Sequence, residues 1–189
     1  MQEYKKIREN IFMVENFLSP EECQEYIDLS EKNGFTKATI NTGRGHVVIE
    51  SIRNHGRFSY DNDELSDKLF ERMKPYLPKI FNTRKISKLN NRIHFYRYDV
   101  GQKFDWHFDG FYSPDAYTNS FFTFFAYLSD DFEGGGTSFL LESIDDTDEF
   151  TIQPKAGTAL FFYHKVEHRG DEVIKGIKYA MRSDVMYTT

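Results

Sequence analysis

The sequence has few cysteines and no long apolar runs, and each of these features excludes a class of protein. Cys23 is the only cysteine, so an internal disulfide is impossible and a reducing, cytoplasmic location is expected. No segment approaches the roughly 18 consecutive apolar residues of a membrane span, and the first six residues contain no apolar signal region. We therefore expect neither a disulfide-stabilised scaffold nor a membrane partner.

Positive charge is also in short supply, with 24 Lys and Arg against 30 Asp and Glu, a formal net charge of −6. Because phosphate backbones are bound by basic surfaces, nucleic acid is not expected as a partner. The length of 189 residues, without a repeat or linker, predicts a single domain over residues 1–189. Aromatic residues make up 17 % of the chain, which favours sheets that carry large rings on their inner faces.

Two helices are predicted in the first half of the chain. The motif SPEE at residues 19–22 combines a capping box with proline at the first helical position, so a helix should run from about residue 20 to 32. A second helix is predicted over residues 64–76, where apolar residues recur at helical spacing before two prolines. We expect residues 1–90 to form a helical support region.

From residue 92 onward the chain changes to short strands separated by Gly, Asn and Asp. The predicted strands span residues 92–98, 121–128, 137–141, 149–152, 158–163 and 178–187. Such a series predicts an α+β, mainly β protein, in which residues 91–189 form a double-stranded β-helix, or jelly roll, on supporting N-terminal helices. The acidic segment 145–148 is interpreted as a solvated turn.

The tripeptide His107-Phe108-Asp109 is the first candidate for chemistry. On an extended backbone, residues i and i+2 point to the same face, so His107 and Asp109 would form a chelating pair if that face lined a cavity. The tripeptide is a weak signal by itself, because a chain with six histidines and many aspartates often contains one by chance. A pair on the surface of a strand is the alternative.

His168 strengthens the case by offering a third ligand. Two histidines and one carboxylate, with three coordination positions left open, form the facial triad that suits iron(II). Such a centre lets one metal hold an organic cosubstrate and oxygen together. Zinc is the alternative metal, since it accepts the same donors.

Lys178 follows this histidine in a predicted strand, where Lys178, Ala180 and Arg182 share one face. A buried cation is costly unless it is paired, so an inward Lys178 would imply an anionic partner such as the distal carboxylate of 2-oxoglutarate. The alternative is that this face of an edge strand lies in solvent, where lysine is commonplace.

Three parts of the sequence, in this order, resemble one family. They are residues 98–109 (YDVGQKFDWHFD), residues 123–139 (TFFAYLSDDFEGGGTSF), and His168 followed by Val173, Gly176 and Lys178. Together they look like the catalytic domain of prolyl 4-hydroxylases and related bacterial 2-oxoglutarate oxygenases, and the resemblance covers roughly residues 92–187. It implies a non-haem iron dioxygenase that hydroxylates a prolyl or other residue in a peptide, or a small molecule, and produces succinate and CO2.

The resemblance assigns a role to each matched position. The Fe(II) ligands would be His107, Asp109 and His168. The cosubstrate 2-oxoglutarate would be held by Lys178, ten positions after the last ligand, with Tyr98 and Tyr127 lining its pocket. The implied partners are 2-oxoglutarate, O2 and a peptide or small-molecule substrate, and ascorbate is a further candidate cofactor.

Three positions depart from the family pattern. Gly136 stands where family members usually carry glutamate before the threonine, and Ser120 stands where many carry arginine. Arg182 occupies a position at which the collagen-type enzymes generally lack a cation. It could bind the second carboxylate of the cosubstrate, bind a substrate anion, or pair with Asp184.

Other classes of function remain open from the residues alone. A catalytically inactive jelly roll that binds a peptide or sugar would keep its affinity when His107 is replaced, and a zinc hydrolase on the same triad would act without oxygen. His164 is the nearest rival of His168 as a ligand, but it lacks the ten-residue interval to a strand lysine. Residues 42–46 and 110–119 are predicted loops that flank the mouth of the site.

Overall fold

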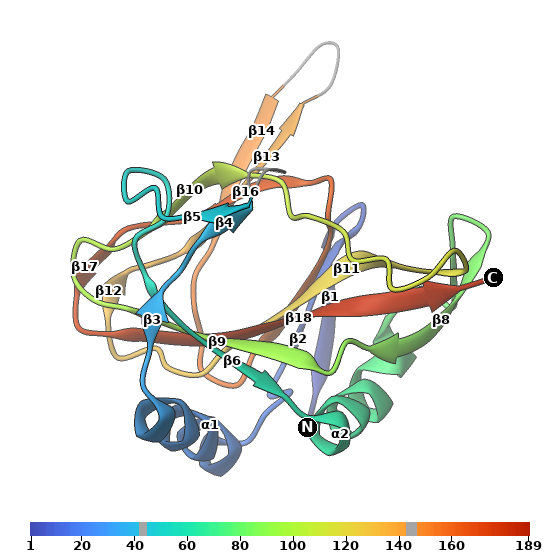
Figure 1. The fold of residues 1–189 in the computed structure, drawn as a ribbon, viewed down its shortest axis with the longest axis horizontal. Coiled ribbons are helices and arrows are strands. Elements are labelled where there is room, and N and C mark those ends of the chain that lie inside the picture. Colours follow the sequence, from blue (N-terminus) through green and yellow to red (C-terminus); the bar gives the residue numbers. More distant parts are fainter. Residues whose placement is uncertain (42–44, 143–146) are drawn as a thin grey trace.

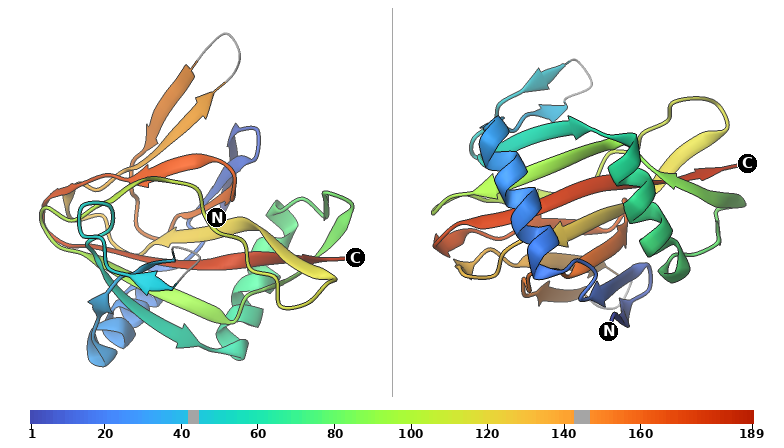
Figure 2. Two further views of the ribbon diagram at one scale, coloured as in Figure 1. Left: turned by 45° about the horizontal axis from the view of Figure 1, so that its top comes forward. Right: turned by 90° about the horizontal axis from the view of Figure 1, so that it is seen from below.

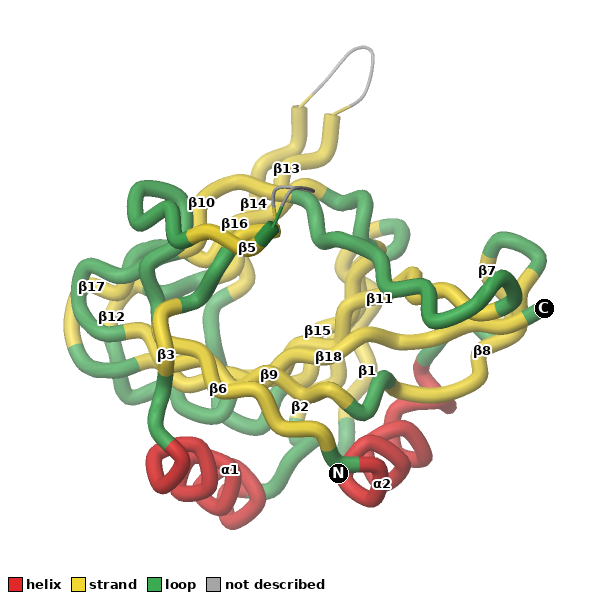
Figure 3. The backbone as a smooth tube through the Cα atoms, viewed as in Figure 1, coloured by secondary structure: helices red, strands yellow, loops and turns green. Residues whose placement is uncertain are grey.

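The computed structural model of the chain describes residues 1–41, 45–142 and 147–189. Residues 42–44 of the predicted loop and residues 145–146 of the predicted acidic turn lie outside these ranges. Two layers of antiparallel strands make up the fold, and the helices lie outside the larger layer (Figures 1 and 3). The prediction of a mainly β jelly roll is confirmed.

The larger layer is an antiparallel sheet in which a strand from the C-terminus takes a central position. Its order is β1 (Glu3–Arg8), β2 (Ile11–Glu15), β15 (Ala159–Tyr163), β11 (Thr118–Tyr127), β18 (Lys178–Thr188), β9 (Arg92–Tyr98), β6 (Gly56–Asp61) and β3 (Thr36–Lys37). The far end of β18 pairs instead with β8 (Arg84–Leu89), which also pairs with β7 (Ile80–Phe81). Because β18 has a partner strand on each side, it is not an edge strand. The interpretation that placed Lys178 on an edge strand is therefore wrong.

The smaller sheet has the order β10 (Phe104–His107), β16 (Glu167–Gly170), β13 (Thr137–Glu142) and β14 (Thr147–Ile152). Its register sets His107 directly opposite His168. Two short pairs complete the strands of the described residues: β12 (Glu133–Gly134) with β17 (Val173–Lys175), and β4 (Ile40–Asn41) with β5 (His46–Val47). The pairing of β10 with β16 therefore fixes the positions of His107 and His168 relative to each other.

Both predicted helices form, and both lie across the outer face of the larger sheet (Figure 2). The helix α1 (Pro20–Asn33) begins at Ser19, which forms a capping box with Glu22. The helix α2 (Asp63–Met73) ends three residues before the predicted boundary, and Lys74–Tyr76 forms a 3-10 turn. Pro75 explains the change, because it cannot donate the backbone hydrogen bond that continues an α-helix. None of the described helices is both long and apolar enough to cross a membrane.

Alternation along β11 assigns its side chains to the two faces of the large sheet. Phe122 and Phe124 are fully buried in the core under the helices, and Phe124 packs against Phe17. Each such phenylalanine stabilises the fold by roughly 1.5–3 kcal/mol. Thr123 and Phe125 point the other way and line a cavity between the two sheets. The strands of the large sheet thus carry an apolar face toward the helices and a mixed face toward the site.

The prediction for residues 1–90 was incomplete. This part contains both helices, but it also contributes β1, β2, β3, β6, β7 and β8 to the large sheet. In β1 the exposed, charged residues of an outer strand hide the apolar alternation that would have predicted it. These strands form because they pair with distant segments such as β15, β9 and β18.

Candidate metal centre and adjoining cavity

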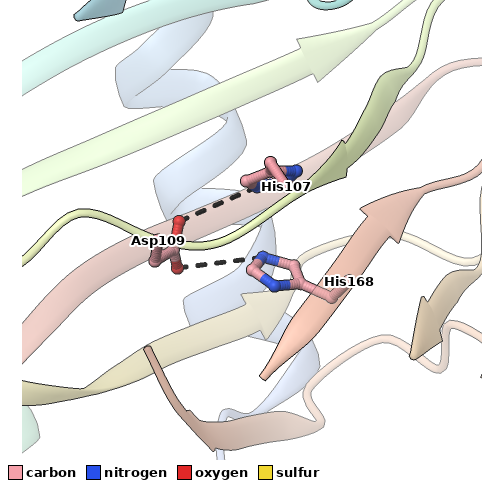
Figure 4. Close-up of side chains that lie close together, drawn as sticks. All are labelled: His107, Asp109 and His168. Carbon is pink, nitrogen blue, oxygen red and sulfur yellow. Dashed lines mark ion pairs between the residues drawn. The ribbon is translucent and has the colours of Figure 1, made fainter. Parts of the chain in front are cut away.

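Three side chains converge at the end of the smaller sheet: His107 from the last position of β10, Asp109 two residues later, and His168 from β16 (Figure 4). One donor atom from each lies within 4.8 Å of the others. The Nε2 atoms of His107 and His168 each lie 3.8 Å from an oxygen of Asp109. The structure thus brings together the three ligands expected from the sequence.

Backbone carbonyls orient both imidazole rings. His107 Nδ1 lies 2.6 Å from the carbonyl oxygen of Asp105, and His168 Nδ1 lies 3.0 Å from that of Val166. An Nδ1–H that donates to a carbonyl leaves the Nε2 lone pair free to bind a metal. Burial lowers the pKa of His107 to about 3, and burial also lowers the pKa of His168. Both rings are therefore neutral at physiological pH, which is the form that binds metals.

The carboxylate of Asp109 is held by two neighbours on the large sheet. Thr123 donates its hydroxyl to Asp109 Oδ2, and Arg182 Nη2 lies 3.3 Å from the same oxygen. Burial opposes ionisation of Asp109, but the Arg182 guanidinium outweighs it and keeps the pKa of this carboxyl well below its usual range. Asp109 is thus an anionic candidate ligand that Thr123 and Arg182 hold from one side.

Arg182 connects this ligand to a second buried carboxylate. Its Nη2 atom lies 2.9 Å from Asp184 Oδ1, so the guanidinium lies between Asp109 and Asp184. Of the three roles considered for Arg182, the pairing with Asp184 is present, and the contact with Asp109 was not foreseen. No local sequence signal indicated it, because Arg182 and Asp184 lie on β18 of the large sheet, whereas Asp109 follows β10 of the smaller sheet.

The donor set fits a divalent transition metal. Two neutral imidazole nitrogens and one carboxylate oxygen converge from one side, as in the two-histidine, one-carboxylate sites that bind iron(II). His164, the rival ligand, is buried beside Asp184 with its Nε2 atom 3.4 Å from Asp184 Oδ1, and it is absent from the group of converging donors in the described residues. Of the two histidines, it is therefore His168 that lies with His107 and Asp109, and its role as a ligand stays a prediction.

A small cavity of about 40 Å³ adjoins His107, Asp109 and His168. Besides the ligands, its lining includes Tyr98, Thr123, Phe125, Lys178 and Arg182. Lys178 is only 1 % exposed, which contradicts the alternative of a solvated strand face. Two cations from β18 therefore line the cavity: the buried ammonium of Lys178 and, four positions later, the guanidinium of Arg182.

The ammonium of Lys178 lies in an environment that weakens its charge. Burial lowers its pKa to about 7. Its Nζ atom donates to the carbonyl oxygen of Gly135 at 2.7 Å and lies 5.0 Å from the ring centroid of Tyr98. Among the described residues no carboxylate lies within ion-pair distance of it, so an anion in the cavity would find an unpaired cation.

Tyr127 lies behind the cavity wall. Its hydroxyl donates to Thr137 Oγ1 at 2.7 Å, and its ring centroid is 5.6 Å from Lys178 Nζ. Thr137 lines the cavity, whereas Tyr127 is not among the lining residues. Close packing against Lys178 and Thr137 accounts for this position, and a direct contact between Tyr127 and a cosubstrate stays a prediction.

The turn without an acidic residue is tightly packed. A Cβ atom on Gly136 would lie 2.5 Å from Thr151 Cγ2 and 3.0 Å from Asp171 Oδ2. The space that a glutamate would need is therefore filled, and a half-buried carboxylate is already supplied by Asp171, which accepts from Ser138. The neighbouring Gly135 has a φ of 61° and presents its carbonyl to Lys178.

Comparison with known proteins agrees with this geometry. Residues 93–183 match the family model of the 2OG-Fe(II) oxygenase superfamily. Prolyl 4-hydroxylase 13 of Arabidopsis thaliana is 25 % identical over 166 residues, which cover 82 % of this chain and 59 % of that protein. The chain thus spans about three fifths of the length of this relative.

Two solved structures share the fold. The viral collagen prolyl hydroxylase of Paramecium bursaria Chlorella virus-1, in complex with 2OG, has a TM-score of 0.62 and 22 % identity, and the match covers 95 % of this chain and 97 % of that one. A prolyl hydroxylase from Trichoplax adhaerens, in complex with a hypoxia inducible factor peptide, has a TM-score of 0.68 and 19 % identity, with 95 % and 83 % covered.

The fold and the converging His-Asp-His donors define a jelly-roll protein with a facial metal site. Together with the match of residues 93–183 and the similarity to prolyl 4-hydroxylases, they support a 2OG-Fe(II) oxygenase of the prolyl hydroxylase-like family.

Proposed function

We propose that the protein is an iron(II)- and 2-oxoglutarate-dependent hydroxylase. The observation that carries this proposal is the position of the His107-Asp109-His168 group beside a cavity that also contains the buried, unpaired ammonium of Lys178. A metal site and a cation in one cavity suit a ligand that chelates the metal at one end and carries a carboxylate at the other.

The residues around the site have separable tasks. Iron, when bound, supplies the oxygen chemistry that couples decarboxylation of 2-oxoglutarate to hydroxylation of a substrate carbon. His107 and His168 offer Nε2 in fixed orientations, and Thr123 and Arg182 hold one oxygen of Asp109. We assign Lys178 to the distal carboxylate of 2-oxoglutarate, with Tyr98 shaping the pocket around it. The apolar lining excludes water from the reaction.

The substrate is proposed to be a prolyl or other residue in a peptide, or a small molecule. The peptide alternative is supported by the relatives named as prolyl hydroxylases and by the peptide complex of one structural neighbour. Ascorbate is proposed as an accessory reductant that keeps the iron in the +2 state. A cytoplasmic location is proposed because Cys23, the single cysteine, is a buried free thiol.

The test of this function is succinate formation by the purified protein with iron(II), 2-oxoglutarate and air. We expect slow succinate release without a prime substrate, and an oxygen gain on the true substrate when peptides and cell extract are screened by mass spectrometry. Anaerobic samples and zinc-loaded samples should be inactive. Activity that persists without oxygen would favour the zinc hydrolase, and ligand binding without any turnover would favour the binding module.

Arg182→Ala should weaken metal binding, because it removes the group that orients Asp109 and leaves two buried carboxylates without a cation. Partners that orient metal ligands typically contribute about 10- to 100-fold in metal affinity. The measurement is a titration with Co(II) or Mn(II), followed by thermal unfolding to verify that the variant is folded. Arg182→Lys should retain part of the affinity, since it keeps the charge.

The matched control is Lys175→Ala, which removes an exposed cation from β17. It should leave metal affinity unchanged. If Arg182→Ala binds metal normally but loses 2-oxoglutarate, the arginine contacts the cosubstrate and our assignment to Asp109 is wrong.

A further inference from the structure

A second, wider cleft of about 710 Å³ adjoins His107 and Asp109. It shares His107, Asp109 and Arg182 with the inner cavity, so the metal site lies where the two hollows meet. Two further arginines, Arg53 and Arg57, line this cleft but not the inner cavity. A prime substrate that reaches the metal while 2-oxoglutarate fills the inner cavity would occupy this outer cleft.

Neither arginine has a carboxylate partner within the described part of the chain. No Asp or Glu of the described residues lies within ion-pair distance of Arg53 or Arg57, although Arg8, Arg72, Arg92, Arg97, Arg169 and Arg182 each have one. Their hydrogen bonds go to neutral groups instead: Arg57 Nη2 donates to Thr39 Oγ1 at 3.1 Å, and Arg53 Nη1 donates to the Thr39 carbonyl at 3.3 Å. In a chain with a net charge of −6, two neighbouring cations that lack a carboxylate partner at one cleft indicate a site for an external anion.

Both arginines are partly withdrawn from water. Arg53 is 9 % exposed, and burial together with the charge of Arg53 lowers the pKa of Arg57. Unpaired cations in such surroundings are unfavourable, and a bound anion would relieve both the lost hydration and their mutual repulsion. A planar guanidinium is also well suited to bind a carboxylate or phosphate through two parallel hydrogen bonds.

The position of the pair ties it to the reaction site. The guanidinium carbon of Arg53 lies 4.4 Å from the ring centroid of Phe104, and that ring stacks on the His107 ring at a centroid distance of 3.5 Å. Arg57 lies opposite Tyr96 in the β6–β9 register, and Tyr96 lines both hollows. An anion bound by the arginines would therefore belong to a molecule that also reaches the metal.

The acidic residues of the cleft do not cancel this charge. Asp109 and Asp184 are both engaged by Arg182, so the cleft holds three arginines against two aspartates. The side chains of Phe108 and Phe111, which are 59 % and 76 % exposed, add apolar surface to the lining. The cleft thus combines a cationic corner with exposed aromatic rings.

We propose that the prime substrate carries a carboxylate or phosphate group that Arg53 and Arg57 bind, while its apolar part lies against the aromatic lining. This inference rests on the proposed hydroxylase function and specifies the class of substrate. It distinguishes this chain from an enzyme whose site is built for a neutral prolyl peptide.

The test is direct binding of small probes to the full chain loaded with Mn(II) and 2-oxoglutarate. The probes are phenyl phosphate and phenylacetate, which combine a ring with each kind of anion, and phenol, which lacks the charge. We expect at least one anion to bind about ten-fold or more tightly than phenol, as charge-assisted hydrogen bonds imply. The stronger of the two anions then identifies the substrate group.

The variants Arg57→Gln and Arg53→Gln should each reduce anion affinity toward that of phenol without changing phenol binding. Arg92→Gln is the matched control, because Arg92 and its partner Asp61 both lie outside the cleft. This variant should bind the anions as the wild type does. Equal affinity for anions and phenol in the wild type, or anion binding that survives both arginine substitutions, would overturn the proposal. Binding of Mn(II) and 2-oxoglutarate is measured in the same samples, so failure of the proposed function is recognised separately.

Discussion

Asp109→Ala is expected to abolish succinate formation and to weaken metal binding by about 30-fold to several thousand-fold. The substitution removes the proposed anionic ligand and leaves Arg182, whose side chain is 13 % exposed, with one carboxylate fewer. Truncating one partner of such a buried charge pair typically costs about 2–5 kcal/mol, which gives this range. Metal affinity is measured by Co(II) titration, and turnover by succinate release.

His168→Ala should have the same effect on turnover, because it removes a nitrogen ligand from β16. Asp61→Ala is the matched control, since it removes an exposed carboxylate whose partner is Arg92. It should bind metal and release succinate at the wild-type rate. Succinate release at the wild-type rate in His168→Ala would remove the case for this metal centre.

Lys178→Ala should weaken 2-oxoglutarate binding by several kcal/mol, roughly 100-fold or more, and leave metal affinity nearly unchanged. The buried ammonium is the unpaired cation of the inner cavity, so its removal would strand the distal carboxylate of the cosubstrate. Lys178→Arg should retain part of the affinity for 2-oxoglutarate, because the positive charge is kept. The planar guanidinium group fits less well than an ammonium group. The measurement is a titration of 2-oxoglutarate with the metal saturating.

Two comparisons make this result decisive. Lys175→Ala removes an exposed lysine three positions earlier and should not change the affinity for 2-oxoglutarate. Arg182→Ala should affect the metal more than the cosubstrate. Normal 2-oxoglutarate affinity in Lys178→Ala, together with a large loss in Arg182→Ala, would show that the cosubstrate binds the other cation of β18.

The same lysine predicts how cosubstrate binding depends on pH. Because burial lowers the pKa of Lys178 to about 7, the free protein increasingly holds a neutral amine as the pH rises above 7. Binding a carboxylate then requires uptake of a proton, so the affinity for 2-oxoglutarate should fall by up to about tenfold per pH unit above this pKa. Below pH 7 the ammonium is already charged and this dependence should vanish. Calorimetry in buffers of different ionisation enthalpy would detect the proton uptake.

The sequence alone predicted the elements whose signals are local. The capping motif before α1 and the β-branched and aromatic segments of β9, β15 and β18 adopt the expected structure, because their preferences agree with the fold. The i, i+2 spacing predicted that His107 and Asp109 point to one side, His168 was the third candidate in the sequence, and the resemblance implied the same role for it. The proximity of His107 and Asp109 is short-range, whereas His168 reaches them through the pairing of β10 with β16.

The tertiary structure decided what depends on distant neighbours. The alternation of β18 left open whether Lys178 meets solvent, and the pairing of β18 with β11 and β9 buries it. Arg182 could have had three partners, and the register of the large sheet sets it between Asp109 and Asp184. Arg53 shows no motif, and its contact with Phe104 brings it close to the metal ligands. Burial and charge pairing arise from contacts between segments far apart in the chain, so local sequence patterns do not determine them.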